Sequence, residues 1–282
     1  MATNAKESRT VEQKMDTLRS IIGEMESLIV AYSGGTDSAF LAATASEILG
    51  NKALSVTAKS PSLAPAELRD AGALAEKLGL NHRVIETHEV ERDDYAANNP
   101  DRCFFCKDEL YTYLSDFAKD EEYAVIANGT NIDDLGDFRP GISAAKQYGV
   151  RSPMVEANLT KSEIRHLSEG MNLPTWDKPA QACLSSRIPY GTMVTVEALT
   201  QIAEAEEYLH SLGIRQLRVR HHDTVARIEV EPEDFLTLSS EEVRTEVVSK
   251  FREIGYSYVT LDLQGFRSGS LNEILARIGK KS

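Results

Sequence analysis

Apolar residues in the first half of the chain follow two alternating patterns. The continuously apolar run at 28–32 predicts a strand of the kind that a parallel sheet buries on both faces, and further strands are predicted at 54–58, 83–86 and 124–127. Apolar residues at helical spacing predict helices at 8–24, 65–78 and 103–118, and another that runs from the Gly34-Gly35 turn to Gly50. This alternation predicts an α/β protein with a doubly wound parallel sheet, in which ligands bind beyond the carboxyl ends of the strands.

The pattern changes after residue 174. Residues 174–191 are rich in Pro, Ser and Gly and have no periodicity, which predicts a loop that joins two parts. Beyond it we expect a helix at 195–212, a hairpin of 217–220 with 226–230, a helix at 241–254 and a strand at 256–261. The predicted domains are therefore residues 1–180 and a smaller α/β domain at 181–282.

Charge and hydropathy argue against a nucleic-acid-binding protein and against a membrane protein. The 282 residues carry a net charge of −13, which disfavours general nucleic-acid binding because such binding depends on basic side chains that neutralise phosphates. No run approaches the roughly 18 apolar residues that span a membrane, and the N-terminus lacks an apolar signal region. We therefore expect a cytoplasmic protein that binds neither membranes nor nucleic acid.

The loop after the first strand has the composition of an anion site. It reads Ser33-Gly34-Gly35-Thr36-Asp37-Ser38 and leads directly into a helix. Glycines allow close backbone approach, and the first N–H groups of a helix attract anions. The hydroxyls of Ser33 and Ser38 can add donors, and Asp37 can hold Mg²⁺ against a polyphosphate. A simple helix cap explains the two glycines but not the Asp and Ser at these offsets.

The three cysteines are a second chemical signal. Cys103 and Cys106 form a C-x-x-C at the start of a predicted helix, and Cys183 lies in the 174–191 loop between Lys178 and Arg187, which favour a thiolate. A structural zinc usually needs a fourth ligand, whereas three cysteines suit a [4Fe–4S] cluster with one open iron. Three ordinary thiols are the alternative, because a bare C-x-x-C is a weak signal.

The Ser-Gly-Gly-x-Asp-Ser pattern resembles the pyrophosphate loop of the PP-loop ATP pyrophosphatases, which have an adenine nucleotide alpha hydrolase-like fold. The resemblance implies that Ser33, Gly34, Gly35, Asp37 and Ser38 bind ATP with Mg²⁺, and that the substrate is adenylated with release of pyrophosphate. In the loop after the fourth strand, Asn131, Asp133, Asp134, Asp137 and Arg139 are candidates for shaping the ATP or substrate pocket. A capped acidic turn explains these residues nearly as well.

A narrower resemblance covers about residues 8 to 275. The segment from Lys178 to Gly191, together with N-I-D-D-L-G-D-F-R-P-G from Asn131 and L-D-L-Q-G-F-R-S-G from Leu261, resembles the LarE family. Members are ATP-dependent sulfur transferases that help to make the nickel-pincer nucleotide cofactor of lactate racemase. One branch sacrifices the sulfur of a single loop cysteine, and the other holds a [4Fe–4S] cluster on three. The presence of Cys103 and Cys106 leads us to expect the cluster branch, with Cys103, Cys106 and Cys183 as ligands and with Cys183 and Asp37 as catalytic residues.

The resemblance also implies a small-molecule nucleotide substrate, a pyridinium mononucleotide with carboxylates, and a homo-oligomer, a hexamer in relatives. Such a substrate needs a phosphate anchor, for which Arg218, Arg220 and Arg267 are candidates. Acids that can orient these guanidinium groups complete the predicted substrate site with Arg187; they are Glu206, Glu229 and Asp234. Solubilising charges on an exposed strand are the alternative interpretation.

Four other functions remain open at this stage. Sacrificial donation from Cys183 would need no cluster. A tRNA-thiolating PP-loop enzyme would want a basic face, which the net charge of −13 disfavours. An amide-forming PP-loop synthetase would leave the cysteines without a role. A nucleotide sensor or iron–sulfur scaffold would need neither Asp37 nor Cys183 for turnover.

Overall fold

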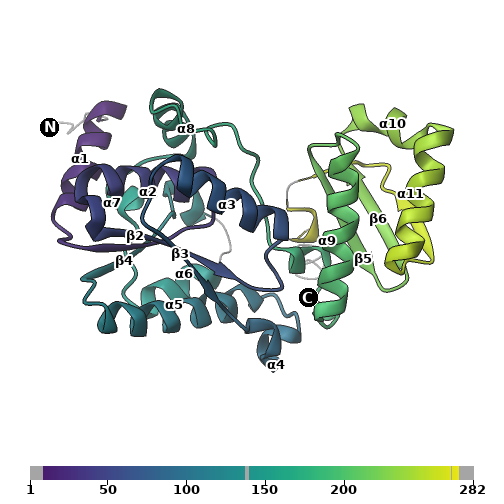
Figure 1. The fold of residues 1–282 in the computed structure, drawn as a ribbon, viewed down its shortest axis with the longest axis horizontal. Coiled ribbons are helices and arrows are strands. Elements are labelled where there is room, and N and C mark those ends of the chain that lie inside the picture. The colour runs from purple at the N-terminus through teal and green to yellow at the C-terminus, as the bar shows by residue number, and fades with distance from the viewer. Residues whose placement is uncertain (1–8, 137–139, 268, 273–282) are drawn as a thin grey trace, which may run out of the picture. The chain divides into compact units, whose positions relative to one another are not determined.

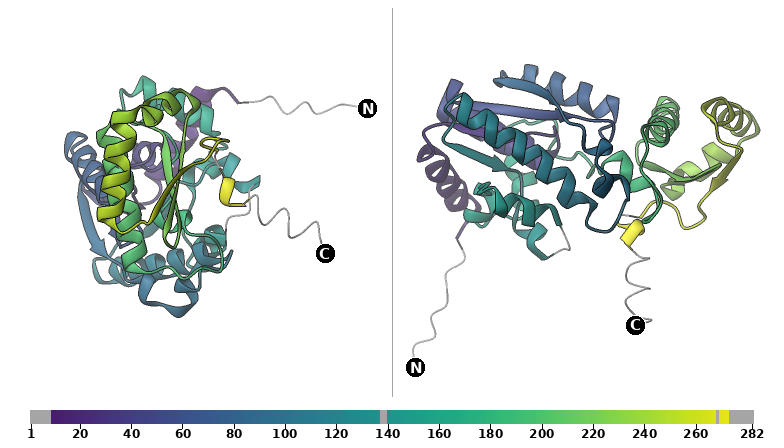
Figure 2. Two further views of the ribbon diagram at one scale, coloured as in Figure 1. Left: turned by 90° about the vertical axis from the view of Figure 1, so that its right-hand side faces the viewer. Right: turned by 90° about the horizontal axis from the view of Figure 1, so that it is seen from below.

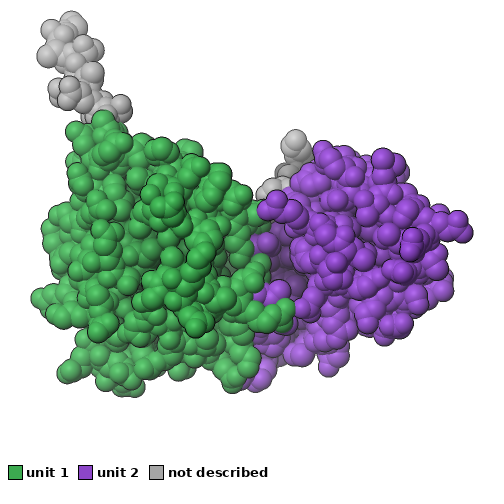
Figure 3. All heavy atoms as spheres, turned by 45° about the horizontal axis from the view of Figure 1, so that its top comes forward, with its two compact units in different colours: residues 1–59, 67–87, 103–180 green, residues 60–66, 88–102, 181–282 purple. Residues whose placement is uncertain are grey.

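A computed structural model describes residues 9–136, 140–267 and 269–272. The chain forms two compact units (Figure 3). Unit 1 comprises Met1–Lys59, Glu67–Thr87 and Cys103–Ala180, and unit 2 comprises Ser60–Ala66, His88–Arg102 and Gln181–Ser282. As functional domains, 1–180 and 181–282 stay a prediction.

Unit 1 is built on a four-stranded sheet in the order β3-β2-β1-β4, and all its strand pairs are parallel. The strands are β1 (Leu28–Ala31), β2 (Ala53–Lys59), β3 (His82–Glu86) and β4 (Val125–Asn128). The bounds of each lie within two residues of those of a predicted strand. The predicted α/β fold with a central parallel sheet and a smaller second sheet is confirmed.

Helices cover both faces of this sheet (Figure 1). On one face, Leu28 and Val30 of β1 join a core formed with α1 (Val11–Gly23), α2 (Thr36–Leu49), α3 (Pro65–Lys77), α7 (Pro153–Glu156) and α8 (Lys161–Gly170). On the other face, Ile29 packs with α5 (Arg102–Asp120) and α6 (Pro140–Gln147). Burial of each large aliphatic side chain contributes roughly 1.5–3 kcal/mol, which explains why an unbroken apolar run is needed in β1.

Short helices complete the N-terminal half of the chain. They are the one-turn helices η1 (Gly50–Lys52), η2 (Glu89–Glu91), α4 (Asp93–Ala96) and η3 (Ile132–Gly136). Within the described ranges, no helix combines the length and the apolar character that crossing a membrane requires.

Unit 2 contains a three-stranded sheet in the order β5-β6-β7. Strands β5 (Leu217–His222) and β6 (Val225–Val230) form the predicted antiparallel hairpin, and β7 (Tyr258–Leu261) pairs in parallel with β6. Helices α9 (Val196–Ser211) and α11 (Glu241–Ile254) cover one face (Figure 2). The shorter elements are η4 (Leu184–Arg187), η5 (Pro232–Asp234), α10 (Phe235–Ser239) and η6 (Ser270–Asn272).

Alternation along the hairpin separates apolar from charged side chains. Leu217 and Val219 of β5 join the core beneath the helices. Residues at the intervening positions lie on the opposite face, where Arg218 pairs in register with Glu229 and Arg220 with Arg227. The fold therefore concentrates charged groups on one face of the small sheet.

Candidate active site

Residues 33–38, which we call the phosphate loop, join the carboxyl end of β1 to the first turn of α2. Gly34 has φ of +70°, and a Cβ at this position would lie 2.8 Å from the Ala71 Cβ of α3. Only glycine satisfies both constraints, because a side chain would be strained and would clash. Gly35 is the N-cap of α2 and has no side chain to cap it, so that first-turn N–H groups remain for an anion.

Hydroxyl groups line the same loop. The Oγ atoms of Ser33 and Ser38 are 3.1 Å apart, and the Ser33 N–H donates to Ser38 Oγ over 3.2 Å. Gly129, which follows β4, approaches so closely that a Cβ there would lie 3.0 Å from the Ser38 nitrogen. The ends of β1 and β4 thus meet at this loop, as the parallel order β1-β4 requires.

Asp37 is the centre of a small polar cluster. Its Oδ2 atom lies 2.5 Å from Nζ of Lys161, and the Asn131 side-chain amide donates to its Oδ1 over 3.5 Å. Asp133 accepts a hydrogen bond of 2.6 Å from the Lys161 backbone N–H at the start of α8. The structure thus places the predicted residues Asp37, Asn131 and Asp133 together. Arg139 and Asp137, also predicted here, lie outside the described residues.

Lys161 was not predicted from the sequence as a site residue. Its position follows from the α8 N-terminus, where the Thr160 hydroxyl accepts from the Glu163 N–H and Glu163 accepts from the Thr160 N–H. This Thr-x-x-Glu capping box is visible in the sequence and marks a helix start. It does not reveal that Asp37 is near.

The three cysteines are divided between the units. Cys103 and Cys106 lie three residues apart in the first turn of α5 in unit 1, whereas Cys183 precedes η4 in unit 2. Cys103 and Cys183 are exposed and Cys106 is half-buried. Thiol donors suit an iron–sulfur cluster. However, the described part of the chain contains no group of three or more His, Cys, Asp or Glu arranged to hold a metal ion. The shared metal site stays a prediction.

Arg102, which is far from Cys183 in the sequence, places its guanidinium group next to the Cys183 sulfur. Arg102 Nη2 lies 3.9 Å from Cys183 Sγ, and Arg102 Nη1 donates to the Ser185 carbonyl over 3.0 Å and to Asn98 Oδ1. The Asn98 amide donates in turn to the carbonyls of Pro189 (2.8 Å) and Thr192 (2.9 Å). Residues 98–102 therefore hold the Cys183 loop from one side.

The two cations that flank Cys183 in the sequence have other partners. Arg187 is buried, forms a two-point ion pair with Glu206 at 2.9 and 2.8 Å, and donates to the Cys183 carbonyl over 3.0 Å. Lys178 pairs with Glu67 in unit 1 at 2.9 Å. Arg187 thus supports the loop through its backbone.

A buried chain of hydroxyl groups leads to the same loop. Ser62 Oγ donates to Glu89 over 2.6 Å, Tyr95 Oη lies 2.8 Å from Ser62 Oγ, and Ser185 Oγ lies 2.7 Å from Tyr95 Oη. Because each hydroxyl has one proton, the bond from Ser62 to Glu89 fixes the direction: Tyr95 donates to Ser62, and Ser185 donates to Tyr95. Glu89 is only 2% exposed. No sequence motif indicated this chain, which ends two residues from Cys183.

The charged face of the small sheet contains the other predicted residues. Arg220 pairs with Glu229 at 2.8 Å and donates to the Ser186 carbonyl over 2.7 Å, and Arg227 pairs with the other Glu229 oxygen at 3.2 Å. Among the described residues, Nε of Arg220 and Nε of Arg227 are buried without a hydrogen-bond partner. Such buried N–H groups favour an acceptor such as a phosphate or carboxylate oxygen.

Arg218 lies in a positively charged environment. Burial, followed by the charges of Arg187 and Arg220, lowers its pKa to about 10, although Glu206 and Glu229 act in the opposite direction. Its guanidinium group lies 5.1 Å from the centre of the Phe266 ring. The structure thus brings together Arg187, Glu206, Arg218, Arg220 and Glu229. We call the surface that these residues form the arginine face, and its positive charge can attract an anion.

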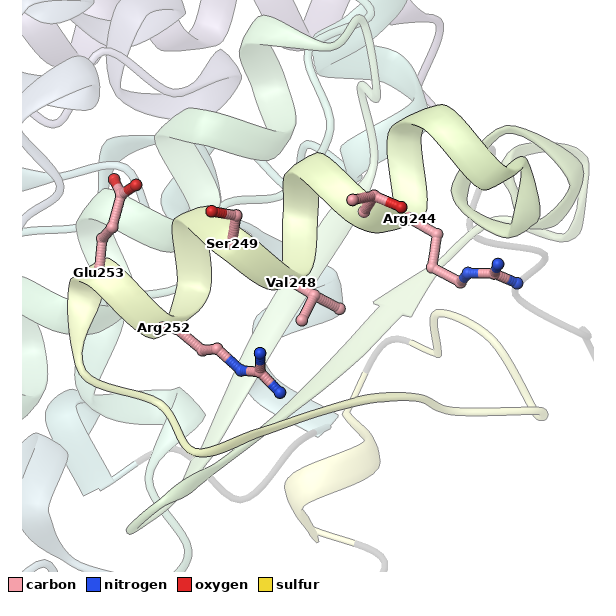
Figure 4. Close-up of a pocket in the computed structure, with 6 residues that line it drawn as sticks. Arg244, Val248, Ser249, Arg252 and Glu253 are labelled. Atoms are coloured by element: carbon pink, nitrogen blue, oxygen red, sulfur yellow. The ribbon is translucent and has the colours of Figure 1, made fainter.

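The remaining two predicted residues are Arg267 and Asp234. Arg267 is half-buried and donates to the Gly265 carbonyl over 3.2 Å. Asp234 ends η5, is half-buried and takes no part in the contacts of the arginine face. A separate open depression runs along α11 and is lined by Arg244, Thr245, Val248, Ser249, Arg252 and Glu253 (Figure 4), and it contains no predicted residue.

Comparison with known proteins identifies relatives across both units. A family model described as NAD synthase matches residues 10–106, which include the phosphate loop and the C-x-x-C. The pyridinium-3,5-bisthiocarboxylic acid mononucleotide synthase of Lactiplantibacillus plantarum is 36% identical over 273 residues, which cover 95% of this chain and 97% of that protein. An uncharacterized protein of Synechocystis sp. is 46% identical over 95% of this chain and 100% of its own length. Another from Methanocaldococcus jannaschii is 32% identical over 86% and 91%.

Proposed function

The chain belongs to the LarE family, and from this premise we propose that it is an ATP-dependent sulfur transferase that converts carboxylates of a pyridinium dicarboxylate mononucleotide into thiocarboxylates. The observation that carries the proposal is 36% identity to a pyridinium-3,5-bisthiocarboxylic acid mononucleotide synthase over 95% of the chain. The phosphate loop supports the activation of the carboxylate by ATP, and the arginine face supports the binding of the substrate phosphate.

The first step is the activation of the carboxylate. A carboxylate is a poor electrophile, so one of its oxygens attacks the α-phosphorus of ATP and displaces pyrophosphate, giving an acyl-adenylate. Backbone N–H groups of Gly34, Gly35 and the first turn of α2 stabilise the leaving pyrophosphate. Asp37 is placed to hold Mg²⁺, with Ser33 and Ser38 as hydroxyl donors. Asn131 and Asp133 hold this corner of the site in place, because they contact Asp37 and the Lys161 backbone.

The second step replaces AMP by sulfur. A sulfur nucleophile adds to the acyl carbon, AMP leaves with the oxygen that attacked phosphorus, and a thiocarboxylate remains. We assign the sulfur site to Cys103, Cys106 and Cys183. A [4Fe–4S] cluster on these three thiolates would supply the sulfur nucleophile. The chain itself contributes the positions of the thiols, with Arg102 beside Cys183 and Arg187 on its carbonyl.

The arginine face is proposed to bind the substrate phosphate. Arg218 and Arg220 have guanidinium groups whose geometry suits two-point contact with phosphate. Glu229 orients Arg220, and Glu206 orients Arg187. Arg267 and Asp234 are the remaining members of the proposed site. From the family resemblance we further propose a homohexamer located in the cytoplasm.

An amide-forming synthetase is the second candidate, because the matching family model for residues 10–106 is that of an NAD synthase. The region from 107 onward contains Cys183 and the arginine face, for which amide formation has no use. The decisive experiment supplies MgATP and the pyridinium dicarboxylate mononucleotide to anaerobically purified protein, with and without ammonium, and identifies products by mass spectrometry. Thiocarboxylate without ammonium supports the sulfur transferase, and an ammonium-dependent amide would refute it.

A further inference from the structure

The segment that leads to Cys183 is tied to the phosphate loop. We call residues 175–178 the connecting turn. Its Thr175 carbonyl accepts a hydrogen bond of 2.7 Å from the Thr36 hydroxyl, and Lys178 O lies 3.5 Å from the same hydroxyl. All these contacts lie within unit 1. The connecting turn thus rests on the residue that separates Gly35 from Asp37 in the Ser-Gly-Gly-Thr-Asp-Ser motif.

Two further side chains of unit 1 hold the same turn. Arg165 of α8 donates to Trp176 O over 2.7 Å and to Lys178 O over 2.9 Å. The Lys178 ammonium pairs with Glu67 of α3 at 2.9 Å. Glu67 stands one helical turn before Ala71, against which Gly34 of the phosphate loop packs. The loop and the turn therefore share both α2 and α3 as supports.

Thr36 differs from its neighbours in the motif. Its side chain is only 4% exposed and its hydroxyl proton is directed to the connecting turn, whereas its backbone N–H belongs to the first turn of α2, where a phosphate would bind. The Thr36 side chain thus holds the connecting turn, while its backbone N–H is available to the phosphate site. Five peptide units separate Lys178 from Cys183, so their Cα atoms can be at most about 18 Å apart.

We propose that Thr36 is a positioning residue for sulfur transfer, which fixes the segment that bears Cys183 relative to the bound nucleotide. This inference rests on the proposed function. A misplacement of a reacting group by about 1 Å can cost on the order of 100-fold in rate. Loss of the Thr36 hydroxyl is therefore expected to slow the sulfur step more than it slows adenylation.

The test compares Thr36→Val with Thr36→Ser and with a matched control. Thr44→Val removes another buried hydroxyl of α2, which donates to Phe40 O of its own helix over 2.8 Å. Adenylation is measured as substrate-dependent exchange of pyrophosphate into ATP, and sulfur transfer as thiocarboxylate formed. For Thr36→Val we expect a loss of roughly 10- to 100-fold in kcat for thiocarboxylate. Exchange should fall by a clearly smaller factor, because fixation of the Cys183 segment does not enter that step.

Thr36→Ser is expected to restore thiocarboxylate formation, because it keeps the donor, and Thr44→Val should resemble the wild type. Arg165→Met removes two other bonds of the connecting turn without altering the loop, so it tests the same idea should Thr36→Val fold poorly. Equal losses of exchange and thiocarboxylate in Thr36→Val, or no loss in either, would overturn the proposal.

A second readout does not depend on turnover. In protein freed of iron by a chelator, so that the Cys183 thiol can react, the alkylation rate of Cys183 by iodoacetamide should change when a non-hydrolysable ATP analogue with Mg²⁺ is added. The rate is followed on the Cys183 peptide by mass spectrometry. Thr36→Val should abolish that change, and Thr36→Ser should retain it. If the wild type makes no thiocarboxylate, the proposed function fails. The alkylation readout still tests whether Thr36 links the nucleotide site to the Cys183 segment. A nucleotide effect of equal size in Thr36→Val would disprove the link.

Discussion

The ammonium group of Lys161 lies 2.5 Å from the carboxylate of Asp37. Asp37 is also the residue that we propose to hold Mg²⁺. A carboxylate that takes up Mg²⁺ loses much of its attraction for a neighbouring ammonium, so MgATP binding is expected to release Lys161 toward the phosphates. The ion pair is therefore expected to break when MgATP binds.

Lys161→Met is therefore predicted to weaken MgATP binding and slow adenylation by about 10- to 100-fold, through loss of a charge-assisted contact to phosphate. Pyrophosphate exchange at varied ATP concentration measures both effects. Lys146→Met on α6, which removes an exposed lysine, is the control. Wild-type ATP dependence in Lys161→Met would show that Lys161 serves only to neutralise Asp37.

The cysteine variants separate the two possible sulfur donors. Cys183→Ala is predicted to abolish thiocarboxylate formation with either donor, whereas Cys103→Ala abolishes it only if three thiolates hold a cluster. Iron and acid-labile sulfide analysis of anaerobically purified protein should give roughly four of each per chain in the wild type. A fully active Cys103→Ala, together with loss of the elements of H₂S from Cys183 during turnover, would assign the protein to the sacrificial branch.

The hydroxyl chain that ends at Ser185 is predicted to stabilise unit 2. Tyr95→Phe removes the acceptor of the buried Ser185 hydroxyl and one donor to Ser62, at a cost of about 1–3 kcal/mol in the free energy of unfolding. Urea unfolding measures this value, and Tyr113→Phe, which removes the hydroxyl of a 43% exposed side chain, is the control. An equally small change in both variants would contradict the account of the chain.

The buried ion pair of Arg187 and Glu206 is predicted to contribute more to stability than an exposed ion pair does. Both side chains are less than 10% exposed, so Arg187→Met should leave an uncompensated buried carboxylate and cost roughly 3–5 kcal/mol. Arg19→Met breaks a pair with Glu47 whose side chains are 44% and 53% exposed, and should cost about 0–1 kcal/mol. Comparable losses in the two variants would mean that Arg187 contributes to stability no more than a surface arginine.

The pair of Glu163 with Lys14 predicts a pH dependence of stability. Burial acts to raise the pKa of Glu163, but hydrogen bonds from Lys14 and Thr160 outweigh it and hold the pKa below the usual 4.5. A carboxyl group with a depressed folded pKa stabilises the protein above its unfolded pKa, and this contribution disappears as the pH falls through the folded pKa. The difference in unfolding free energy between wild type and Glu163→Gln should thus be largest above pH 4.5 and shrink below it. A difference that does not vary with pH would contradict this assignment.

The sequence revealed those elements whose signal is local. The apolar run of β1, the glycine turn and the start of α2 are consecutive, and the hairpin of β5 and β6 follows from alternation within a few residues. Helices α6 and α8 were not predicted. Helix α6 begins with Pro140-Gly141, which usually signals a turn, and α8 is short, although its Thr-x-x-Glu start is a readable cap.

The contacts that organise the site join residues far apart in the chain. Lys161 meets Asp37 across 124 positions, Thr36 meets Thr175 across 139, and Arg102 meets Cys183 across 81. No periodicity connects such pairs, since only the folded sheet and its loops bring them together. This is why the sequence indicated Lys178 and Arg187, the neighbours of Cys183 along the chain, as its cations and did not indicate Arg102.

The transfer of substrate oxygen into AMP tests the central claim most directly. The substrate is prepared with ¹⁸O in its carboxylates, and the AMP formed during turnover is analysed by mass spectrometry alongside the thiocarboxylate. Attack of the carboxylate on the α-phosphorus predicts one ¹⁸O in the phosphate of AMP for every thiocarboxylate group made. Thiocarboxylate accompanied by unlabelled AMP, or by ADP and phosphate, would contradict an acyl-adenylate and with it the role assigned to the phosphate loop.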